Sequence, residues 1–529
     1  PAPLAAVPPV PDLRRLAPSL ADLAPWLARA PVTPVLDPDS LGPTPIERLA
    51  ARDFVLRNVE RGGVSPAPEV IVETPDTPPA DPFTDLLMEV RTRGEIGGDW
   101  TRFRPAAPAA VAFPRDSGQV CRLVSAAAAA GIPLVPSGGR TGLSGGAVAA
   151  NGEVVVSFDR MRRVLEFSPS DSSLTVEAGV VTAQIQELAR QKGLYYPVSF
   201  ASEGSSQIGG NIATNAGGIR VLRYGTTRDR VTGLKVVTGE GRELELNRGL
   251  VKNASGYDSR HLFIGSEGTL GLIVEATLQL ESEPPPSCVM LLGLPGMDAL
   301  MDVFNLLRMS LQLSAFEFFT DRALAHVCNA QGLPQPLSSG CPVYALAEFD
   351  CPGQEEEESA LEAFNQGLAA DWLVDGVISR DTRQAAALWR YREGISESIS
   401  HFPPYKNDLS VRVSRVAEFL QRMDRLVEEL CPGYEVVWYG HIGDGNLHLN
   451  ILKPPGESIG EFETRSHSIS EASYALTAEM GGSISAEHGI GLLKQPWLNR
   501  VRSEEEIELM KGLKKVFDPA GIFNPGKLL

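Results

Sequence analysis

Two short stretches near the end of the chain concentrate side chains that could hold a metal ion and move a proton. The stretch His441-Ile442-Gly443-Asp444-Gly445-Asn446-Leu447-His448 places two histidines around a Gly-Asp-Gly-Asn turn, and residues 485–491 add Glu487 and His488. A turn that folds the chain back lets both imidazoles face one point. Two histidines and a carboxylate form a common catalytic metal set with positions left open for substrate. Spacing alone leaves open the alternative that one histidine packs in a core and another is exposed.

Three glycine-rich segments form a second group of candidate residues. Residues 137–146 hold five glycines, residues 208–218 combine glycines with Asn and Thr, and residues 265–271 read Gly-Ser-Glu-Gly-Thr-Leu-Gly. Dense glycine lets successive backbone N–H groups turn toward one anion, for which a diphosphate is the obvious guest. The segments match neither the GxGxxG dinucleotide motif nor a GK[ST] phosphate loop. Any one of them could be an idle surface turn, but three so close together favour a nucleotide site.

Alternating helices and strands are expected to position these loops. Helices are predicted over residues 120–130 and 182–192. Buried strands are predicted over residues 132–136, 154–158, 174–178, 234–238 and 272–278. Alternation of this kind, with glycine at the strand ends, indicates an α+β or α/β nucleotide-binding arrangement.

The histidine and glutamate stretches belong to a different part of the chain. Residues 281–286 read Glu-Ser-Glu-Pro-Pro-Pro, which cannot continue a sheet interior or a helix and therefore marks a domain boundary. Strands are expected beyond it over residues 289–292, 343–349, 436–438 and 447–452. Helices are expected over residues 297–313, 356–370, 382–400, 416–431 and 462–480. This pattern predicts a second domain in which helices cover an antiparallel sheet.

Composition narrows the class of protein. A chain of 529 residues predicts two or more domains, and 43% hydrophobic residues suffice for sizeable cores. The net charge of −18 argues against binding to nucleic acid or to anionic lipid surfaces. No apolar run reaches the roughly 18–20 residues that span a bilayer, and no secretory signal is visible. The six cysteines lack CxxC spacing, which disfavours a zinc ribbon or iron–sulfur cluster and favours a reducing compartment.

The glycine-rich segments resemble the FAD domain of the vanillyl-alcohol oxidase superfamily, and the resemblance extends from about residue 100 to the C-terminus. It implies an α+β fold, with a two-subdomain FAD-binding (PCMH-type) domain and a C-terminal antiparallel sheet with helices. The first loop has neither the His nor the Cys that carries covalent flavin, so noncovalent FAD is expected. The residues expected to bind FAD are Pro136, Ser137, Gly138, Gly139, Arg140, Thr141, Gly142, Ser144, Gly145, Gly209, Gly210, Asn211, Thr214, Asn215, Gly217, Gly218, Glu267, Gly268, Ile273 and Asn524.

The C-terminal stretches resemble FAD-linked D-2-hydroxy acid dehydrogenases of that superfamily. The resemblance implies that His441, His448 and Glu487 bind a divalent metal and that His488 is the base. Zinc suits these ligands, with Mn²⁺ or another divalent ion as the alternative. The positions expected to bind substrate are Arg392, Ser396, Lys406 and Asn450. They match the subfamily that acts on D-2-hydroxyglutarate, although Ser396 replaces a threonine and Arg140 stands where that subfamily often has asparagine.

The resemblance also suggests a division of the chain. We expect a Pro- and Ala-rich N-terminal extension over residues 1–95, the FAD-binding domain over 96–283, the substrate and metal domain over 284–490, and a segment over 491–529 that returns to the FAD domain. Residues 13–27 and 45–59 of the extension could form short helices.

The expected activity is oxidation of a D-2-hydroxy acid to the 2-oxo acid, with D-2-hydroxyglutarate first and D-malate next. A D-lactate or glycolate dehydrogenase of the same fold and a noncatalytic flavin subunit of an electron-transfer complex are the alternatives. The electron acceptor is expected to be an electron-transferring flavoprotein or a quinone. We expect the cytoplasm, or an organelle matrix in a eukaryote, and leave a homodimer open.

Overall fold

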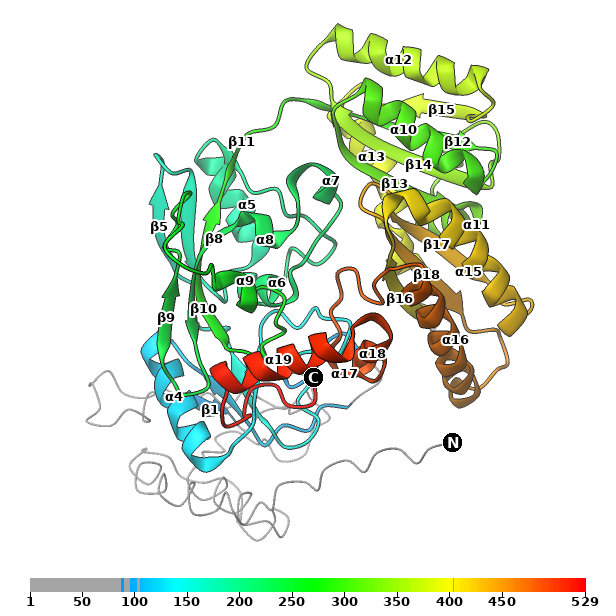
Figure 1. Cartoon of the computed structure of the whole chain (residues 1–529). Helices are drawn as coiled ribbons and strands as arrows, with labels where there is room; N and C mark the ends of the chain where they lie inside the picture. The colour runs from blue at the N-terminus through cyan, green and yellow to red at the C-terminus, as the bar shows by residue number, and fades with distance from the viewer. Residues whose placement is uncertain (1–86, 90–95, 102–104, 403) are drawn as a thin grey trace, which may run out of the picture.

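The chain forms two lobes joined near residue 282, as the computed structural model shows (Figure 1). It describes residues 87–89, 96–101, 105–402 and 404–529. The short helices expected over residues 13–27 and 45–59 lie outside the described residues. None of the described helices is both long and apolar enough to cross a membrane.

The first lobe contains a small mixed sheet in the order β1-β2-β4-β3. Its strands are β1 (Leu87–Glu89), β2 (Ala110–Phe113), β4 (Val154–Ser157) and β3 (Leu134–Ser137). Strands β2 and β3 run parallel to β4, whereas β1 is antiparallel to β2. Helix α4 (Ser117–Ala130) begins where the Asp116 side chain accepts from the Gln119 amide and ends at Gly131, whose φ is 64°. It delivers the chain into β3, which leads directly into the first glycine-rich loop.

A second, antiparallel sheet of the first lobe has the order β5-β6-β10-β8-β9. Its strands are β5 (Val164–Ser168), β6 (Ser173–Glu177), β10 (Leu272–Gln279), β8 (Val231–Val237) and β9 (Glu243–Leu246). Between them lie α5 (Thr182–Gln191), α6 (Ile208–Thr214), α7 (Val221–Tyr224), α8 (Thr227–Arg230) and α9 (Arg260–Phe263). Side chains of α4 and of both sheets share one apolar core, which fixes the loops between them.

The second lobe is built on a seven-stranded antiparallel sheet in the order β15-β12-β14-β13-β17-β18-β16. Its strands are β15 (Asp375–Ile378), β12 (Ser287–Leu294), β14 (Val343–Asp350), β13 (Leu313–Thr320), β17 (Val436–His441), β18 (Asn446–Leu452) and β16 (Pro404–Ser410). A two-stranded pairing of β7 (Leu194–Tyr195) with β11 (Glu281–Ser282) precedes it in the first lobe.

Helices cover both faces of this sheet. Helices α10 (Leu300–Ser310), α12 (Gln354–Ala369), α15 (Val416–Leu430) and α16 (Ile459–Glu479) contribute to the core on one face. Helices α11 (Asp321–Gln331), α13 (Thr382–Glu393) and α14 (Ile395–Ser398) contribute to the core on the other. Because side chains of a strand alternate between faces, both cores draw on the same strands.

Two predicted helices of the second lobe are wrong in extent, and three of its strands, β13, β15 and β16, were not predicted. The helix expected over residues 297–313 ends at Ser310, because the apolar run from Leu313 to Phe319 forms central strand β13. The helix expected over residues 382–400 is interrupted at Gly394, so that α13 and α14 are separate. Strands β13 and β16 both carry residues of the site described below.

The end of the chain returns to the first lobe. After α17 (Gly491–Lys494), α18 (Leu498–Val501) and α19 (Glu504–Phe517), Phe523 forms a parallel bridge with Leu134 beside β3. Figure 1 shows α19, coloured red, lying along the first lobe near α4. The C-terminal segment thus runs from the stretch that contains Glu487 and His488 to the glycine-rich loops of the first lobe.

Candidate active site

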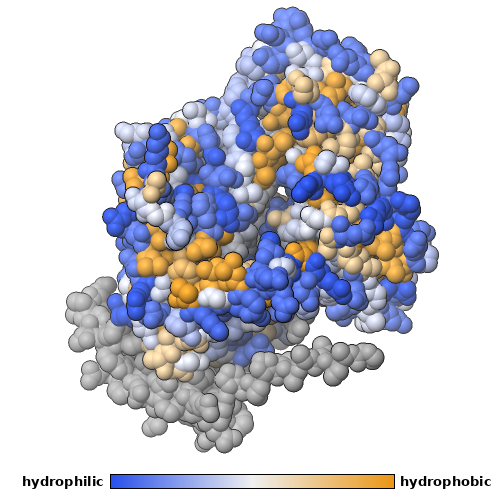
Figure 2. Space-filling view, in the orientation of Figure 1, coloured by the Kyte–Doolittle hydropathy of each residue, from blue (hydrophilic) through white to orange (hydrophobic). Residues whose placement is uncertain are grey.

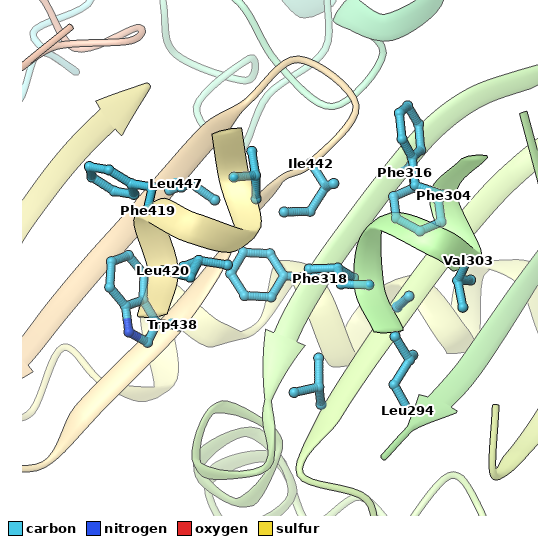
Figure 3. Packing of buried hydrophobic residues seen from close by; sticks show 14 of the residues in the cluster. Leu294, Val303, Phe304, Phe316, Phe318, Phe419, Leu420, Trp438, Ile442 and Leu447 are labelled. Atoms are coloured by element: carbon cyan, nitrogen blue, oxygen red, sulfur yellow. The ribbon is translucent and has the colours of Figure 1, made fainter. Parts of the chain in front are cut away.

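A tight turn between β17 and β18 holds the two histidines of the first stretch. His441 is the last residue of β17, His448 lies early in β18, and the ring centroids are 5.3 Å apart. Ile442 and Leu447, each adjacent to one of the histidines, are fully buried, and Figure 3 shows them packed with Phe318 of β13. This packing fixes the backbone of the turn and thereby the direction of both rings.

A buried carboxylate lies beside Nδ1 of each histidine, within hydrogen-bond distance for His441 and beyond it for His448. His441 Nδ1 lies 2.8 Å from Oε1 of Glu317 on β13, and His448 Nδ1 lies 3.7 Å from Oδ1 of Asp408 on β16. Carboxylates that orient histidines through one ring nitrogen, leaving Nε2 for a cation, are typical of metal sites. His448 Nε2 is 3.9 Å from Oε1 of Glu487. The structure therefore brings His448 and Glu487 together, and His441 lies beside His448 but outside the group of described donor atoms that all lie within 4.8 Å of one another.

Asp408 also fixes the second stretch. Its Oδ2 accepts hydrogen bonds from the backbone amides of Ala486, Glu487 and His488, at 2.9–3.0 Å, and its Oδ1 accepts from Asn446 Nδ2 at 2.7 Å. Donor atoms of Asp408, His448, Glu487 and His488 all lie within 4.8 Å of one another. Because four N–H groups already occupy Asp408, this residue orients the others rather than serving as the natural ligand of a cation.

Burial sets the charge state of this cluster. Burial and the neighbouring His441 hold the pKa of His448 well below its usual value, as a neutral ligand requires. Burial lowers and Glu317 raises the pKa of His441, with a net rise to about 9. Burial raises the pKa of Glu487 to about 7 and lowers the pKa of His488. His441 and Arg392 compensate the charge of this buried carboxylate only in part, and a bound metal ion would add to that compensation.

The glycine-rich loops of the first lobe require glycine because neighbouring backbone approaches closely. A Cβ on Gly139 would lie 2.1 Å from the Ser205 carbonyl oxygen, and one on Gly218, where φ is 138°, would lie 2.1 Å from the Ser199 oxygen. Gly268, with φ of 69°, packs in the same way on Pro136. A Cβ on Gly210, by contrast, would meet only open space, so that the backbone there is accessible to a ligand.

These loops meet the histidine and glutamate cluster directly. Ser144 Oγ donates to the His488 carbonyl at 2.9 Å, and a Cβ on Gly217 would lie 3.4 Å from Glu487 Oε2. Glu267 accepts from the backbone amides of Ile490 and Gly491, each at 2.7 Å. All three glycine-rich segments therefore border the cluster, and the surface is hollowed between the two lobes (Figure 2).

Several side chains expected to bind FAD also make contacts within the protein. Asn211 Nδ2 donates to Thr182 at 2.6 Å, Thr214 Oγ1 donates to the Gly210 carbonyl, and Asn215 Oδ1 accepts from the Arg228 amide. Arg140 pairs with Asp159 at 3.0 Å.

Asn524 links two of the loops, because its Nδ2 donates to the carbonyls of Gly146 and Glu267. Its Oδ1 and the Oε1 of Gln207 are buried without a hydrogen-bond partner among the described residues. Such orphaned acceptors beside glycine-rich backbone fit the ribityl and ring N–H or O–H donors of a flavin. Ile273 is buried at the start of β10, and Ser137 ends β3.

The residues expected to bind substrate gather on the same side of the second sheet. Lys406 of β16 is the register partner of Asn450 on β18, and Lys406 Nζ donates to Ser396 Oγ at 3.0 Å. The Arg392 guanidinium lies 4.7 Å from the ring centroid of Tyr439 and pairs with Glu317 at 2.8 Å. Its Nε is buried without a hydrogen-bond partner among the described residues.

Glu317 connects the two groups, since it contacts both Arg392 and His441. Sequence reasoning missed Glu317, Asp408 and Tyr439. A lone carboxylate in the apolar run Phe316-Glu317-Phe318-Phe319 was the available signal, because an unpaired buried charge is costly.

Comparison with known proteins agrees with this geometry. The model of the FAD binding domain matches residues 108–247, and that of the C-terminal domain of FAD linked oxidases matches residues 283–528. The chain is 52% identical over 443 residues to "D-2-hydroxyglutarate dehydrogenase" of Stutzerimonas stutzeri (strain A1501), a match that covers 84% of this chain and 96% of the relative. The chain belongs to the D-2-hydroxyglutarate dehydrogenase family.

Two further relatives are less similar to this chain. "D-2-hydroxyglutarate dehydrogenase, mitochondrial" of Arabidopsis thaliana is 35% identical, with 84% of this chain and 79% of the relative covered. A "Putative D-lactate dehydrogenase C713.03, mitochondrial" of Schizosaccharomyces pombe (strain 972 / ATCC 24843) is 34% identical, with 78% and 80% covered. The expected family and the status of an FAD-dependent oxidoreductase are confirmed.

A solved structure confirms the expected fold. Alkyldihydroxyacetonephosphate synthase superposes with a TM-score of 0.60 at 17% identity, covering 80% of this chain and 77% of that chain. The two share the vanillyl-alcohol oxidase fold, including an FAD-binding domain followed by a domain with an antiparallel sheet.

Proposed function

We propose that this enzyme oxidises D-2-hydroxyglutarate to the 2-oxo acid, with D-malate as a second substrate. The observation that carries the proposal is the group Arg392, Ser396 and Lys406 beside the histidine cluster. A guanidinium and an ammonium suit a second carboxylate, which D-2-hydroxyglutarate and D-malate have and D-lactate lacks. A D-lactate dehydrogenase is the second candidate, because one relative carries that name.

We further propose that His441, His448 and Glu487 hold a divalent cation, with zinc as the expected ion. Two imidazoles and one carboxylate leave coordination positions for substrate oxygens. The Nδ1 contacts to Glu317 and Asp408 support this assignment, because they leave Nε2 of each ring as the ligand atom.

When bound, noncovalent FAD supplies a hydride acceptor for C2, and the cation supplies a Lewis acid for the 2-hydroxyl. The chain's own residues orient the acid between these groups. His488 lies beside the proposed ligands and accepts the hydroxyl proton, a role worth roughly 10²–10⁴-fold in rate. Asn450 and Ser396 place hydrogen-bonding groups near Tyr439, so that the acid is fixed along its length.

The reduced flavin must then pass its electrons on. We propose an electron-transferring flavoprotein or a quinone as the acceptor, in the cytoplasm or an organelle matrix. The expected alternative of a noncatalytic flavin subunit is disfavoured, because the proposed ligands and base are all present and close together.

Anaerobic titration of the flavin with D-2-hydroxyglutarate, D-malate and D-lactate tests the proposal. We expect both dicarboxylates to bleach the flavin absorbance of the metal-loaded enzyme at lower concentration than D-lactate. Lys406→Ala should raise the concentration needed for either dicarboxylate at least tenfold, since a charge-assisted hydrogen bond contributes about 1.5–3 kcal/mol. An equal loss with D-lactate would reject the dicarboxylate assignment.

A further inference from the structure

A buried lysine with no role so far lies between the flavin loops and the histidine cluster. Lys494 ends the single helical turn α17, three residues after Gly491, whose amide donates to Glu267 of the third glycine-rich loop. Only 6% of the residue is exposed. Its Nζ is buried and has no hydrogen-bond acceptor among the residues that the structure describes.

Two of the three carboxylates around Lys494 already accept hydrogen bonds from other donors. Those whose charge acts on its ammonium are Asp408, Glu267 and Glu487. Asp408 accepts from three backbone amides and Asn446, and both Glu267 oxygens accept from the amides of Ile490 and Gly491. The buried ammonium therefore has N–H donors without an acceptor among the described residues. Burial of such an ammonium destabilises the folded protein by about several kcal/mol unless a ligand accepts its hydrogen bonds.

The position of Lys494 identifies the ligand. The amide of Leu493, the residue before Lys494, donates to the Ser144 carbonyl of the first glycine-rich loop, and Ser144 Oγ donates to the His488 carbonyl. His488 must sit where proton and hydride leave adjacent atoms of the substrate, a step that rests on the proposed function. We therefore expect the Lys494 ammonium to lie at the reacting end of the flavin rather than at its adenine.

We infer that the ammonium of Lys494 binds the pyrimidine ring of the bound flavin, at N1 or a carbonyl oxygen. Reduction by hydride places negative charge on this ring, and a positive charge beside it favours the reduced form. Asp408, Glu267 and Glu487 produce a negative field that opposes reduction, and Lys494 is one of the buried positive charges that offset it. Lys494 is thus a cofactor-binding residue that tunes the electron affinity of the flavin.

The flavin midpoint potential, measured anaerobically with a chemical reductant and a reference dye, tests this inference without any substrate. Lys494→Met keeps the length of the side chain and removes its charge. We expect the two-electron reduction equilibrium to weaken at least tenfold, which lowers the potential by about 30 mV. Lys494→Arg should restore most of the potential. Lys453→Met is the control, because Lys453 Nζ donates to the carbonyls of Pro454 and Glu457.

Two outcomes would overturn the inference. An unchanged potential with weaker binding of D-2-hydroxyglutarate would assign the ammonium to the substrate, and no change in either quantity would make Lys494 a packing residue. If Lys494→Met does not retain flavin, Lys494→Gln is measured in the same way. A wrong substrate assignment leaves the potential of the wild type and its dependence on Lys494 intact, so the two failures are distinguishable.

Discussion

At the scale of single residues, the site depends on carboxylates that touch neither the proposed cation nor the substrate. Asp408 is fully buried and joins β16 to the Ala486–His488 backbone and to His448. The pKa of its carboxyl lies well below the usual range: burial raises it, and His488, Lys494 and His448 more than offset that effect. Asp408 therefore stays ionised, lies beside His448 and holds the backbone of Glu487.

Replacement of Asp408 should weaken metal binding without removing a ligand. For Asp408→Asn we expect cation affinity to fall about 10–100-fold, because the amide cannot accept from every present donor or orient His448 as a carboxylate does. Competition with a chromophoric chelator measures the affinity. Asp424→Asn is the control, since Asp424 is an exposed residue whose carboxylate accepts a hydrogen bond from Trp438 at 2.6 Å outside the site. Equal losses in both variants would show a general effect on stability.

At the scale of elements, close backbone contacts determine the conformation of the glycine-rich loops. The first loop passes so near residues 205–206 that even a methyl group on Gly139 would clash with the backbone. The sequence predicted these loops because glycine density is a local property. It could not show that Ser144 bonds to His488 or that Glu267 caps Ile490, because these contacts join residues more than 200 positions apart.

A methyl group in that loop should therefore displace the backbone that surrounds the cofactor. We expect Gly139→Ala to weaken FAD retention at least tenfold or to destabilise the protein by about 1–3 kcal/mol, as overpacking does. Flavin content after gel filtration and the thermal midpoint measure the two effects. Gly204→Ala, where a Cβ meets nothing within 4 Å, should match the wild type. Unchanged flavin content and stability in Gly139→Ala would contradict the close approach.

The strands that sequence reasoning missed show why the rest of the site was hidden. Strand β16 contains Lys406, Asn407 and Asp408 in succession, so that its pattern reads as polar although Asn407 and Asp408 are buried. Lys406 and Asp408 share the face of Asn450 and His448, whereas Asn407 lies on the opposite face, so both faces of the strand carry polar residues and the expected alternation is absent. Strand β13 was read as the end of a helix, because a short apolar run does not distinguish the two. The histidine and glutamate stretches were predictable because their residue types are specific.

At the scale of the whole molecule, two ion pairs join the lobes. Arg220, at the start of α7 in the first lobe, donates to both oxygens of Glu348 on β14, at 2.9 and 3.1 Å. Ser314 and Trp389 of the second lobe also donate to Glu348. Arg223 and Asp350 form a second pair alongside. This contact sets the orientation in which the flavin loops meet the cluster.

Removal of one partner should loosen the lobes. We expect Glu348→Gln to lower the free energy of unfolding by about 3 kcal/mol, because Arg220 loses the charge that compensates its burial. Scanning calorimetry measures the change. Glu418→Gln, which removes an exposed pair with Arg415 within one helical turn, should cost less than about 1 kcal/mol. Similar small effects of both substitutions would show that other contacts hold the lobes.

The central claim is that His441, His448 and Glu487 converge on one cation beside the flavin ring. Anomalous diffraction at the zinc edge, from crystals of the zinc-loaded enzyme with FAD, tests it most directly. We expect one peak at about 2.0–2.2 Å from Nε2 of each histidine and from the Glu487 carboxylate, next to the flavin ring. A peak bound by Asp408 in place of His441, a peak remote from the flavin, or no peak at these residues would contradict it.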